Sequence, residues 1–118
     1  MARGDIFLIG LPTSDRREEK GRRPAIAVQT DVAASPMLMI VPVTSSLGAL
    51  RFTFTVKLEP SPANGLTLTS VAMIFQMRAI DRRRIIRRIG NLEPAYLTQV
   101  DAEIWRMLKP SNDPEAQE

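Results

Sequence analysis

The chain of 118 residues contains no cysteine and no histidine. The lack of cysteine excludes disulfides, thiolate nucleophiles and cysteine-based zinc sites, and the lack of histidine removes the commonest acid-base group and metal ligand. Any catalysis must therefore use arginine, carboxylates and hydroxyls, and we expect no metal or other cofactor.

Long apolar runs are also missing. No run approaches the roughly 20 residues that a membrane-spanning helix needs, and residues 1–4 show no signal-peptide pattern. We therefore expect a cytoplasmic protein with no membrane partner. Because 44% of the residues are apolar and no repeat or linker is visible, the sequence predicts one compact domain over residues 1–110, followed by a polar tail at 111–118.

The net charge is only +3, but the cations are clustered. Five of them lie between Arg16 and Arg23, and six arginines lie between Arg78 and Arg88 with only Asp81 opposing them. Such clustering favours an anionic partner. A solvated face explains the same pattern equally well, because a basic patch is a weak signal.

Two predicted strands organise the chain. An apolar strand at residues 25–29 follows Pro24, and a second at residues 37–43 is interrupted by Pro42, which indicates an edge or a bulge. A strand pair is rigid, so we expect Arg23 at its entry and Thr44 at its exit to meet at one rim. A long polar loop at residues 11–23 separates this pair from a first strand at residues 5–10.

Further strands follow. Residues 51–58 alternate cleanly and predict a half-exposed strand with Phe52, Phe54, Val56 and Leu58 on one face. Residues 70–80 predict a long strand in which Gln76 and Arg78 share a face.

The end of the chain predicts the only long helix. A short turn at residues 81–84, capped by Asp81, leads to a strand at residues 85–89. Pro94 then begins a helix that stops at Pro110, with an apolar stripe at helical spacing. We expect Trp105 to pack on the sheet or on a second subunit. The stripe consists of Leu97, Val100, Ile104 and Leu108.

The predicted elements imply a mainly β fold with one helix: a small, bent antiparallel sheet or partly open barrel, crossed by the C-terminal helix. The methionines at 37, 39, 73 and 77 are more typical of core filling than of a ligand site.

An ordered set of short motifs, from Arg3 to Leu108, resembles the MazF/PemK family of toxin endoribonucleases. The chain departs from the family pattern by carrying Arg16 and Arg17 where members often have Gly-Ser, and Phe75 where many have an acid. The motifs that carry the resemblance are Arg3-Gly4-Asp5-Ile6, Gly21-Arg22-Arg23-Pro24, Val41-Pro42-Val43-Thr44-Ser45, residues 52–58, Gly65-Leu66, Ser70-Val71-Ala72, Gln76-Met77-Arg78-Ala79-Ile80-Asp81 and Gly90-Asn91-Leu92.

The resemblance implies an SH3-like barrel (MazF/CcdB-like) that forms a homodimer, cleaves single-stranded RNA without a metal, and is neutralised by a cognate antitoxin protein. It places the central catalytic pair on Arg23 and Thr44, and a loop carboxylate on Glu18. Attack of a ribose 2′-hydroxyl on the adjacent phosphate builds negative charge on the phosphoryl oxygens, which a guanidinium and a hydroxyl can stabilise.

The remaining candidate residues are assigned to RNA binding. Arg17, Arg22 and Ser45 flank the catalytic pair in sequence. Gln76 and Arg78 either contact RNA or brace the barrel. The run from Arg82 to Arg88 is more typical of a solvated or backbone-tracking surface than of a catalytic one.

Two other function classes stay open. A catalytically weak barrel would bind RNA or a protein without cutting it. A gyrase poison of similar fold would end in Trp-Gly-Ile, whereas this chain ends in Ala116, Gln117 and Glu118, which disfavours that class.

Overall fold

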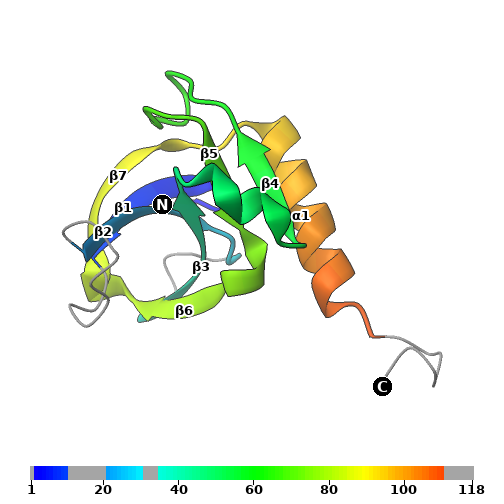
Figure 1. Ribbon diagram of the computed structural model, residues 1–118. Helices are drawn as coiled ribbons and strands as arrows, with labels where there is room; N and C mark the ends of the chain where they lie inside the picture. Colours follow the sequence, from blue (N-terminus) through cyan, green and yellow to red (C-terminus); the bar gives the residue numbers. More distant parts are fainter. Residues whose placement is uncertain (1, 11–20, 31–34, 111–118) are drawn as a thin grey trace.

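The chain folds into a strongly bent antiparallel sheet of seven strands, followed by one helix (Figure 1). This computed structural model describes residues 2–10, 21–30 and 35–110. The strands are β1 (Asp5–Gly10), β2 (Arg22–Ala27), β3 (Met37–Thr44), β4 (Thr55–Leu58), β5 (Ser70–Met73), β6 (Arg78–Asp81) and β7 (Ile85–Asn91). Three short 3-10 segments, η3 (Leu47–Arg51), η4 (Ile74–Gln76) and η5 (Arg82–Arg84), precede the helix α1 (Pro94–Leu108).

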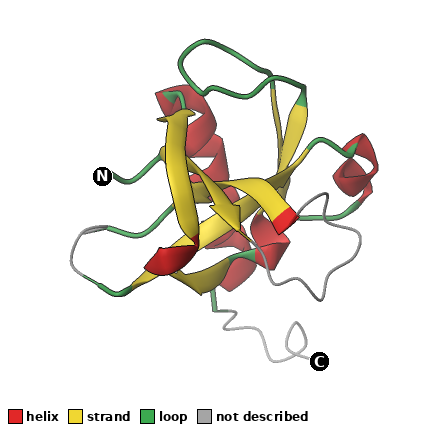
Figure 2. Ribbon diagram, turned by 90° about the vertical axis from the view of Figure 1, so that its left-hand side faces the viewer, coloured by secondary structure: helices red, strands yellow, loops and turns green. Residues whose placement is uncertain are grey.

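The central strand is β3. The strand order is β4-β5-β3-β2-β1-β7, and β6 also pairs with β3. The beginning of β3 pairs with β6 and its end pairs with β5, so that β3 belongs to both halves of the bent sheet. Figure 2 shows α1 lying behind the strands and crossing them. The predicted fold class, a small antiparallel barrel with a C-terminal helix, is confirmed.

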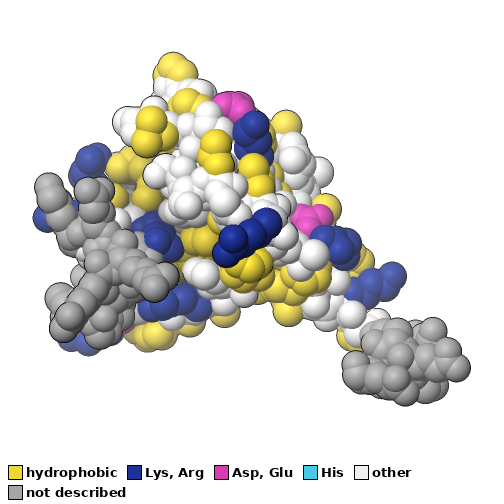
Figure 3. All heavy atoms as spheres, viewed as in Figure 1, with side chains coloured by type: hydrophobic (Ala, Val, Ile, Leu, Met, Phe, Trp, Pro, Cys, Tyr) yellow, Lys and Arg dark blue, Asp and Glu magenta, His cyan; other side chains and the backbone are white. Residues whose placement is uncertain are grey.

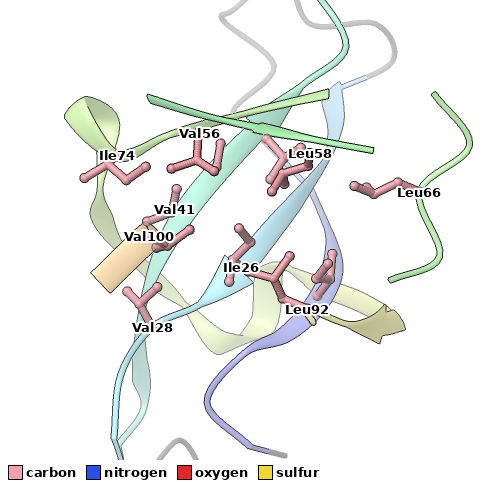
Figure 4. Packing of buried hydrophobic residues seen from close by; sticks show 12 residues of the cluster. Ile26, Val28, Val41, Val56, Leu58, Leu66, Ile74, Leu92 and Val100 are labelled. Carbon is pink, nitrogen blue, oxygen red and sulfur yellow. The ribbon is translucent and has the colours of Figure 1, made fainter. Parts of the chain in front are cut away.

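Two apolar clusters hold this sheet, one on each side of it. Alternation along β2 separates them: Ile26 faces the first cluster, whereas Ala25 and Ala27 face the second. The first lies between the sheet and α1, and Figure 4 shows Val100 of the helix among the strand residues. The second fills the inside of the barrel with side chains from β1, β2, β3 and β6. Each fully buried aliphatic side chain contributes about 1.5–3 kcal/mol.

The helix begins at Pro94, as predicted. Leu97, Val100 and Ile104 pack against the first cluster, but Met107 takes the place predicted for Leu108, which is 59% exposed. In Figure 1 the last turn of α1 extends past β4. Trp105 is 65% exposed and does not pack on the sheet. Among the described residues, no helix is both long and apolar enough to cross a bilayer.

The prediction of a continuous strand over residues 51–58 is wrong. Residues up to Arg51 form η3, and only Thr55–Leu58 pairs as β4. Phe54 has a φ of 60°, which an extended strand does not allow. The two aromatic side chains therefore separate: Phe52 stacks on Phe75 with 5.2 Å between ring centroids, and Phe54 packs on the first cluster.

The predicted long strand over residues 70–80 is also interrupted. Val43 is three positions after Ile40 on β3, whereas their partners, Ala72 for Val43 and Arg78 for Ile40, are six positions apart. The three extra residues are accommodated by η4 (Ile74–Gln76), where the chain passes from one half of the sheet to the other. The expected turn at Asp81 is confirmed, because its side chain accepts a hydrogen bond from the Arg83 N–H.

Candidate active site

Arg23 and Thr44 lie at the same end of neighbouring strands. β2 begins at Arg22, earlier than predicted, so that Arg23 is within the strand and opposite Ile9 of β1. The pairing of β2 with β3 places Ala25 opposite Pro42. If this register is continued by two residues, Arg23 is opposite Thr44. The two residues are thus brought to one rim of the sheet, as the sequence predicts.

A pocket with a volume of about 360 Å³ opens beside Thr44. Thr44 and Ser45 belong to its lining, and so does Pro24, the residue after Arg23. Arg23 is half-buried and is not part of the lining. The other lining residues are Leu8, Val43, Gly65, Leu66, Thr67, Leu68, Ser70, Arg87 and Ile89.

The hydroxyl of Thr44 is oriented by the turn that follows β3. Its Oγ1 accepts a hydrogen bond of 3.1 Å from the backbone N–H of Ser46. Since a hydroxyl has one donor and two acceptor positions, the proton of Thr44 remains available to donate to an anion. The side chain is half-buried, and Ser45 beside it is exposed.

One wall of the pocket is built by the loop of residues 59–69, seen at the top of Figure 1. The side chain of Asn64, fully buried, connects this loop internally. Its Oδ1 accepts from the N–H groups of Ser61 and Leu66 at 3.0 Å, and its Nδ2 donates to the Glu59 carbonyl and to Glu93 Oε1 at 2.9 and 3.1 Å. All the polar atoms of the Asn64 amide are thereby satisfied, which fixes the loop.

The Glu93 carboxylate anchors the same loop to the start of α1. Ser61 Oγ donates to Glu93 Oε2 at 2.8 Å, in addition to the bond from Asn64. Burial by itself would raise the pKa of Glu93, but the hydrogen bonds from Ser61, from its own backbone N–H and from Asn64 lower it below the usual range. The charged form of Glu93 is therefore the one that holds the loop.

Two glycines allow this loop to lie directly on β7. A Cβ on Gly65, whose φ is 72°, would lie 2.0 Å from the carbonyl oxygen of Ile89. A Cβ on Gly90 would lie 2.3 Å from the carbonyl carbon of Asn64. The Asn91 N–H also donates to the Ala63 carbonyl at 2.8 Å. The pocket wall and β7 are thus in close backbone contact.

The strand β1 is held to β7 by a buried carboxylate. Asp5 Oδ1 accepts from Arg88 Nε at 3.1 Å and from Asn91 Nδ2 at 2.9 Å. Burial would raise the pKa of Asp5, but hydrogen bonds from Asn91, from the Ala2 N–H and from Arg88, together with the charge of Arg88, lower it. Arg88 is therefore committed to a structural ion pair.

Arg87 is the residue of the pocket that sequence reasoning did not single out. It lies in the basic run interpreted above as a solvated surface, yet it lines the pocket opposite Thr44 and Ser45. The residues before and after it, Ile86 and Arg88, are on the opposite face of β7, because side chains alternate along a strand. Only the pairing of β7 with β1, which places Arg87 opposite Leu8, brings it to the site.

Gln76 and Arg78 do not share a strand face, which corrects the prediction. Gln76 ends η4, and Arg78 begins β6. Both are exposed, and neither lines the pocket. Arg78 lies opposite Ile40, which is four residues before Thr44 and thus about 13 Å along β3 from it.

The remaining predicted residues have different outcomes. Arg22 is exposed at the first position of β2, opposite Gly10. Glu18 and Arg17 lie outside the described residues, so their predicted roles stay predictions. In the described ranges, no group of three or more acidic side chains could hold a metal ion.

Basic side chains surround this end of the barrel. In Figure 3 they lie over the side that carries β2 and β7, where acidic side chains are few. Hydrogen bonds from the Arg83 side chain and N–H lower the pKa of Asp81 to about 2, so that this carboxylate stays charged at neutral pH. Asp81 lies opposite Met37, at the other end of β3 from Thr44, whereas Arg23 lies at the rim and Arg87 in the pocket lining, so that the charges nearest the pocket suit an anionic ligand.

Sequence comparison finds related toxins. The family described as "PemK-like, MazF-like toxin of type II toxin-antitoxin system" matches residues 2–108. The chain is 32% identical over 108 residues to the Mycobacterium tuberculosis protein "Endoribonuclease MazF9", covering 86% of this chain and 90% of that protein. It is 26% identical over 101 residues to "Endoribonuclease EndoA" of Bacillus subtilis, covering 84% and 86%.

Solved structures show the same fold. A mycobacterial endoribonuclease in complex with its cognate antitoxin superposes with a TM-score of 0.72 at 17% identity, covering 94% of this chain and 98% of that one. The MazE-MazF complex of Deinococcus radiodurans gives a TM-score of 0.72 at 20% identity, with coverage of 94% and 97%. At these identities the likeness concerns the fold.

Proposed function

Because the chain belongs to the PemK-like, MazF-like family of toxins of type II toxin-antitoxin systems, we propose that it is an endoribonuclease that cleaves single-stranded RNA without a metal cofactor. The relatives named endoribonucleases support this activity. The observation that carries the assignment to a site is the position of Arg23 and Thr44 at one rim, beside a pocket in a basic surface.

In the proposed reaction, the 2′-hydroxyl oxygen of one ribose attacks the adjacent phosphorus. A new P–O bond forms and the 2′-hydroxyl loses its proton, while the bond to the 5′-oxygen of the next nucleotide breaks and that oxygen takes up a proton. The products are a 2′,3′-cyclic phosphate and a 5′-hydroxyl. The nucleophile is already held beside the phosphorus, so that no separate reactant has to be positioned. The main requirement is to stabilise the negative charge that develops on the phosphoryl oxygens.

Arg23 and Thr44 meet this requirement in different ways. The guanidinium stays protonated and can donate to two phosphoryl oxygens at once. The Thr44 hydroxyl, whose oxygen already accepts from Ser46, can donate one further hydrogen bond. Removing one such donor from a preorganised site lowers the rate by about 10²–10³.

Proton transfer is assigned to the loop before β2. Glu18 is the proposed carboxylate, although its reference pKa of about 4.3 makes a carboxylate a weak base unless its surroundings raise that pKa. We therefore assign the larger part of catalysis to electrostatic stabilisation. Arg17, Arg22 and Ser45 are proposed to hold the RNA backbone on either side of the reacting phosphate, and Gln76 and Arg78 to contact it further along.

The proposal also includes partners and location. A cognate antitoxin protein would neutralise the toxin, and two structural relatives are described as toxin-antitoxin complexes. We place the protein in the cytoplasm, where its RNA substrate is. We further propose a homodimer, supported by the exposure of Trp105 (65%) and Leu108 (59%) at the end of α1. Sedimentation of the wild type and of Trp105→Ser tests it: a dimer that the substitution dissociates supports this face, and a wild-type monomer contradicts the dimer.

Cleavage of an RNA oligonucleotide tests the function. Cutting should stop when the ribose 5′ to the cleaved bond is 2′-deoxy, because the nucleophile is then missing. Arg23→Lys keeps the charge but cannot form the bidentate hydrogen bonds of a guanidinium, and we expect it to lower kcat about 10²-fold. The matched control is Arg84→Lys, because Arg84 is exposed and lies outside the pocket.

The outcomes separate the alternatives. If Arg23→Lys retains most of the activity, the specific role of the guanidinium is wrong. If RNA is bound and protected but never cut, the chain is a binding module of the same fold.

A further inference from the structure

On one face of the sheet, paired residues of three neighbouring strands form a row that lines the pocket. Arg87 of β7 lies opposite Leu8 of β1, and Leu8 in turn lies opposite Pro24 of β2. All three line the pocket, together with Thr44 and Ser45 at the end of β3. Arg87 is thus on the far side of the pocket from the hydroxyl proposed to act in cleavage.

The pocket combines three kinds of surface. Its lining is about as polar as it is apolar: Leu8, Val43 and Leu66 supply aliphatic surface, and Ser45 and Thr67 add hydroxyls. Arg87 is its only charged lining residue in the described part of the chain. Such a site fits a ligand that is flat and apolar at one end and anionic at the other.

The wall that faces Arg87 is preorganised. Asn64, fully buried and fully hydrogen-bonded, fixes the loop, and Gly65 lets it lie against the backbone of β7. A ligand that enters the pocket therefore meets a surface that is already formed, so that its binding costs little conformational entropy of the loop.

The other arginines of the basic run are placed differently. The guanidinium of Arg83 pairs with Asp81 at 2.8 Å, and Arg88 pairs with Asp5 at 3.1 Å. Arg84 is exposed and lies outside the pocket. Arg87 differs from them: it lines the pocket, and it forms no ion pair with a carboxylate of the described residues.

We propose that this pocket binds the nucleotide next to the cleaved bond, its base against the aliphatic side chains and its phosphate on Arg87. The inference rests on the proposed ribonuclease function, because the pocket adjoins Thr44. It makes Arg87 a substrate-positioning residue and the loop of residues 65–68 a determinant of which nucleotide is accepted.

The first experiment measures binding of an RNA oligonucleotide that carries 2′-deoxyribose at the cleaved position, by fluorescence anisotropy at several salt concentrations. Arg87→Gln should weaken binding about tenfold, because a charge-assisted contact to phosphate is lost. The slope of log K against log salt should fall in magnitude by about 0.7. Arg84→Gln, which removes the same charge outside the pocket, should change the affinity less than twofold.

The second experiment locates the base. Thr67 is an exposed lining residue, so that Thr67→Trp fills the pocket with little effect on folding. A series of oligonucleotides, each with one abasic nucleotide near the cleaved bond, should show one position whose base strengthens wild-type binding. The contribution of that base should be lost in Thr67→Trp, while the melting temperature stays unchanged.

The results separate this inference from the function on which it rests. If cleavage depends on Arg23 but Arg87→Gln behaves like Arg84→Gln, or if no abasic position responds to Thr67→Trp, the nucleotide pocket is wrong and the ribonuclease assignment stands. If RNA is not cut at all, the function is wrong and so is the position of the nucleotide at a cleaved bond, and the same binding series on the unmodified oligonucleotide then tests whether the pocket and Arg87 hold a nucleotide.

Discussion

The two loops that border the pocket are built in opposite ways. The loop of residues 59–66 is fixed by the buried Asn64, by Glu93 at the start of α1 and by close backbone contact with β7. The segment of residues 45–54 contains η3, which has no buried residue and no side-chain cap. Its Leu47 and Phe52 are 47% and 46% exposed.

This difference indicates a division of roles. A loop that is held by a buried, fully hydrogen-bonded amide has one conformation, and it can select a ligand by shape. The second segment has exposed apolar side chains, and apart from the bond from the Phe75 N–H to the Phe54 carbonyl its backbone bonds are local, so that it opens at a lower free energy and can adapt to a ligand or a partner. We therefore expect substitutions in the first loop to affect stability and those in the second to affect mainly binding.

The largest effect is expected from Gly65→Ala. The new Cβ would meet the Ile89 carbonyl oxygen at 2.0 Å, and the φ of 72° is strained for alanine. We expect the free energy of unfolding to fall by about 3 kcal/mol, measured by urea denaturation. The matched control is Gly48→Ala in the second segment, where the nearest atom is 4.0 Å away and the stability should change by less than about 1 kcal/mol. If both substitutions lowered the free energy of unfolding equally, the loop of residues 59–66 would not be more tightly built than the segment of residues 45–54.

Asn64→Ala should have the next largest effect. It removes four hydrogen bonds, leaves the buried N–H of Leu66 without its partner and deprives the Glu93 carboxylate of one donor, while Ser61 still donates to Glu93. We expect a loss of about 2 kcal/mol and faster hydrogen exchange at Leu66. Exchange that speeds up equally in residues 45–54 would show that the two loops are not independent.

Acid should loosen the first loop selectively. The pKa of Glu93 is lowered in the folded state, so that its contribution is present above the unfolded value near 4.5 and is lost as the pH falls through the folded pKa. Asp5 contributes with the same sign, because its pKa is lowered too. Below pH 4.5, the stability of Glu93→Gln should therefore fall less steeply than that of the wild type. Parallel pH profiles would exclude this role of Glu93.

Phe52→Ala should have the smallest effect on stability. The side chain is half-exposed, and its ring contacts the ring of Phe75 at 5.2 Å and the guanidinium of Arg51 at 4.9 Å. We expect a change of about 1 kcal/mol or less in thermal denaturation. A loss as large as that of Asn64→Ala would mean that the second segment is as firmly built as the first.

Local patterns predicted the elements whose signals lie within a few residues. The first strand is Asp5–Gly10 as expected, the helix begins at Pro94, and the Asp81 cap forms. Each depends on alternation, on a proline at a helix start or on a side chain close to its backbone partner. The same rules failed at residues 51–58, where η3 and the positive φ of Phe54 interrupt the alternating pattern, and at residues 70–80, where η4 lets the chain pass from β5 to β6 along β3.

The catalytic candidates were predictable and the pocket was not. Arg23 and Thr44 flank recognisable strands, and a hairpin brings its entry and exit together. Arg87 looked like any other member of a basic run. Its place depends on the pairing of β7 with β1, residues about 80 positions apart, which no local pattern reports.

The amino-acid order by itself therefore determined the fold class, the family and the residue types left for chemistry, since the chain lacks cysteine and histidine. Only the tertiary structure decided which arginine borders the pocket and which loop is fixed. The physical reason is that side-chain alternation and capping are set by near neighbours, whereas a pocket is set by strands that meet across the whole length of the chain.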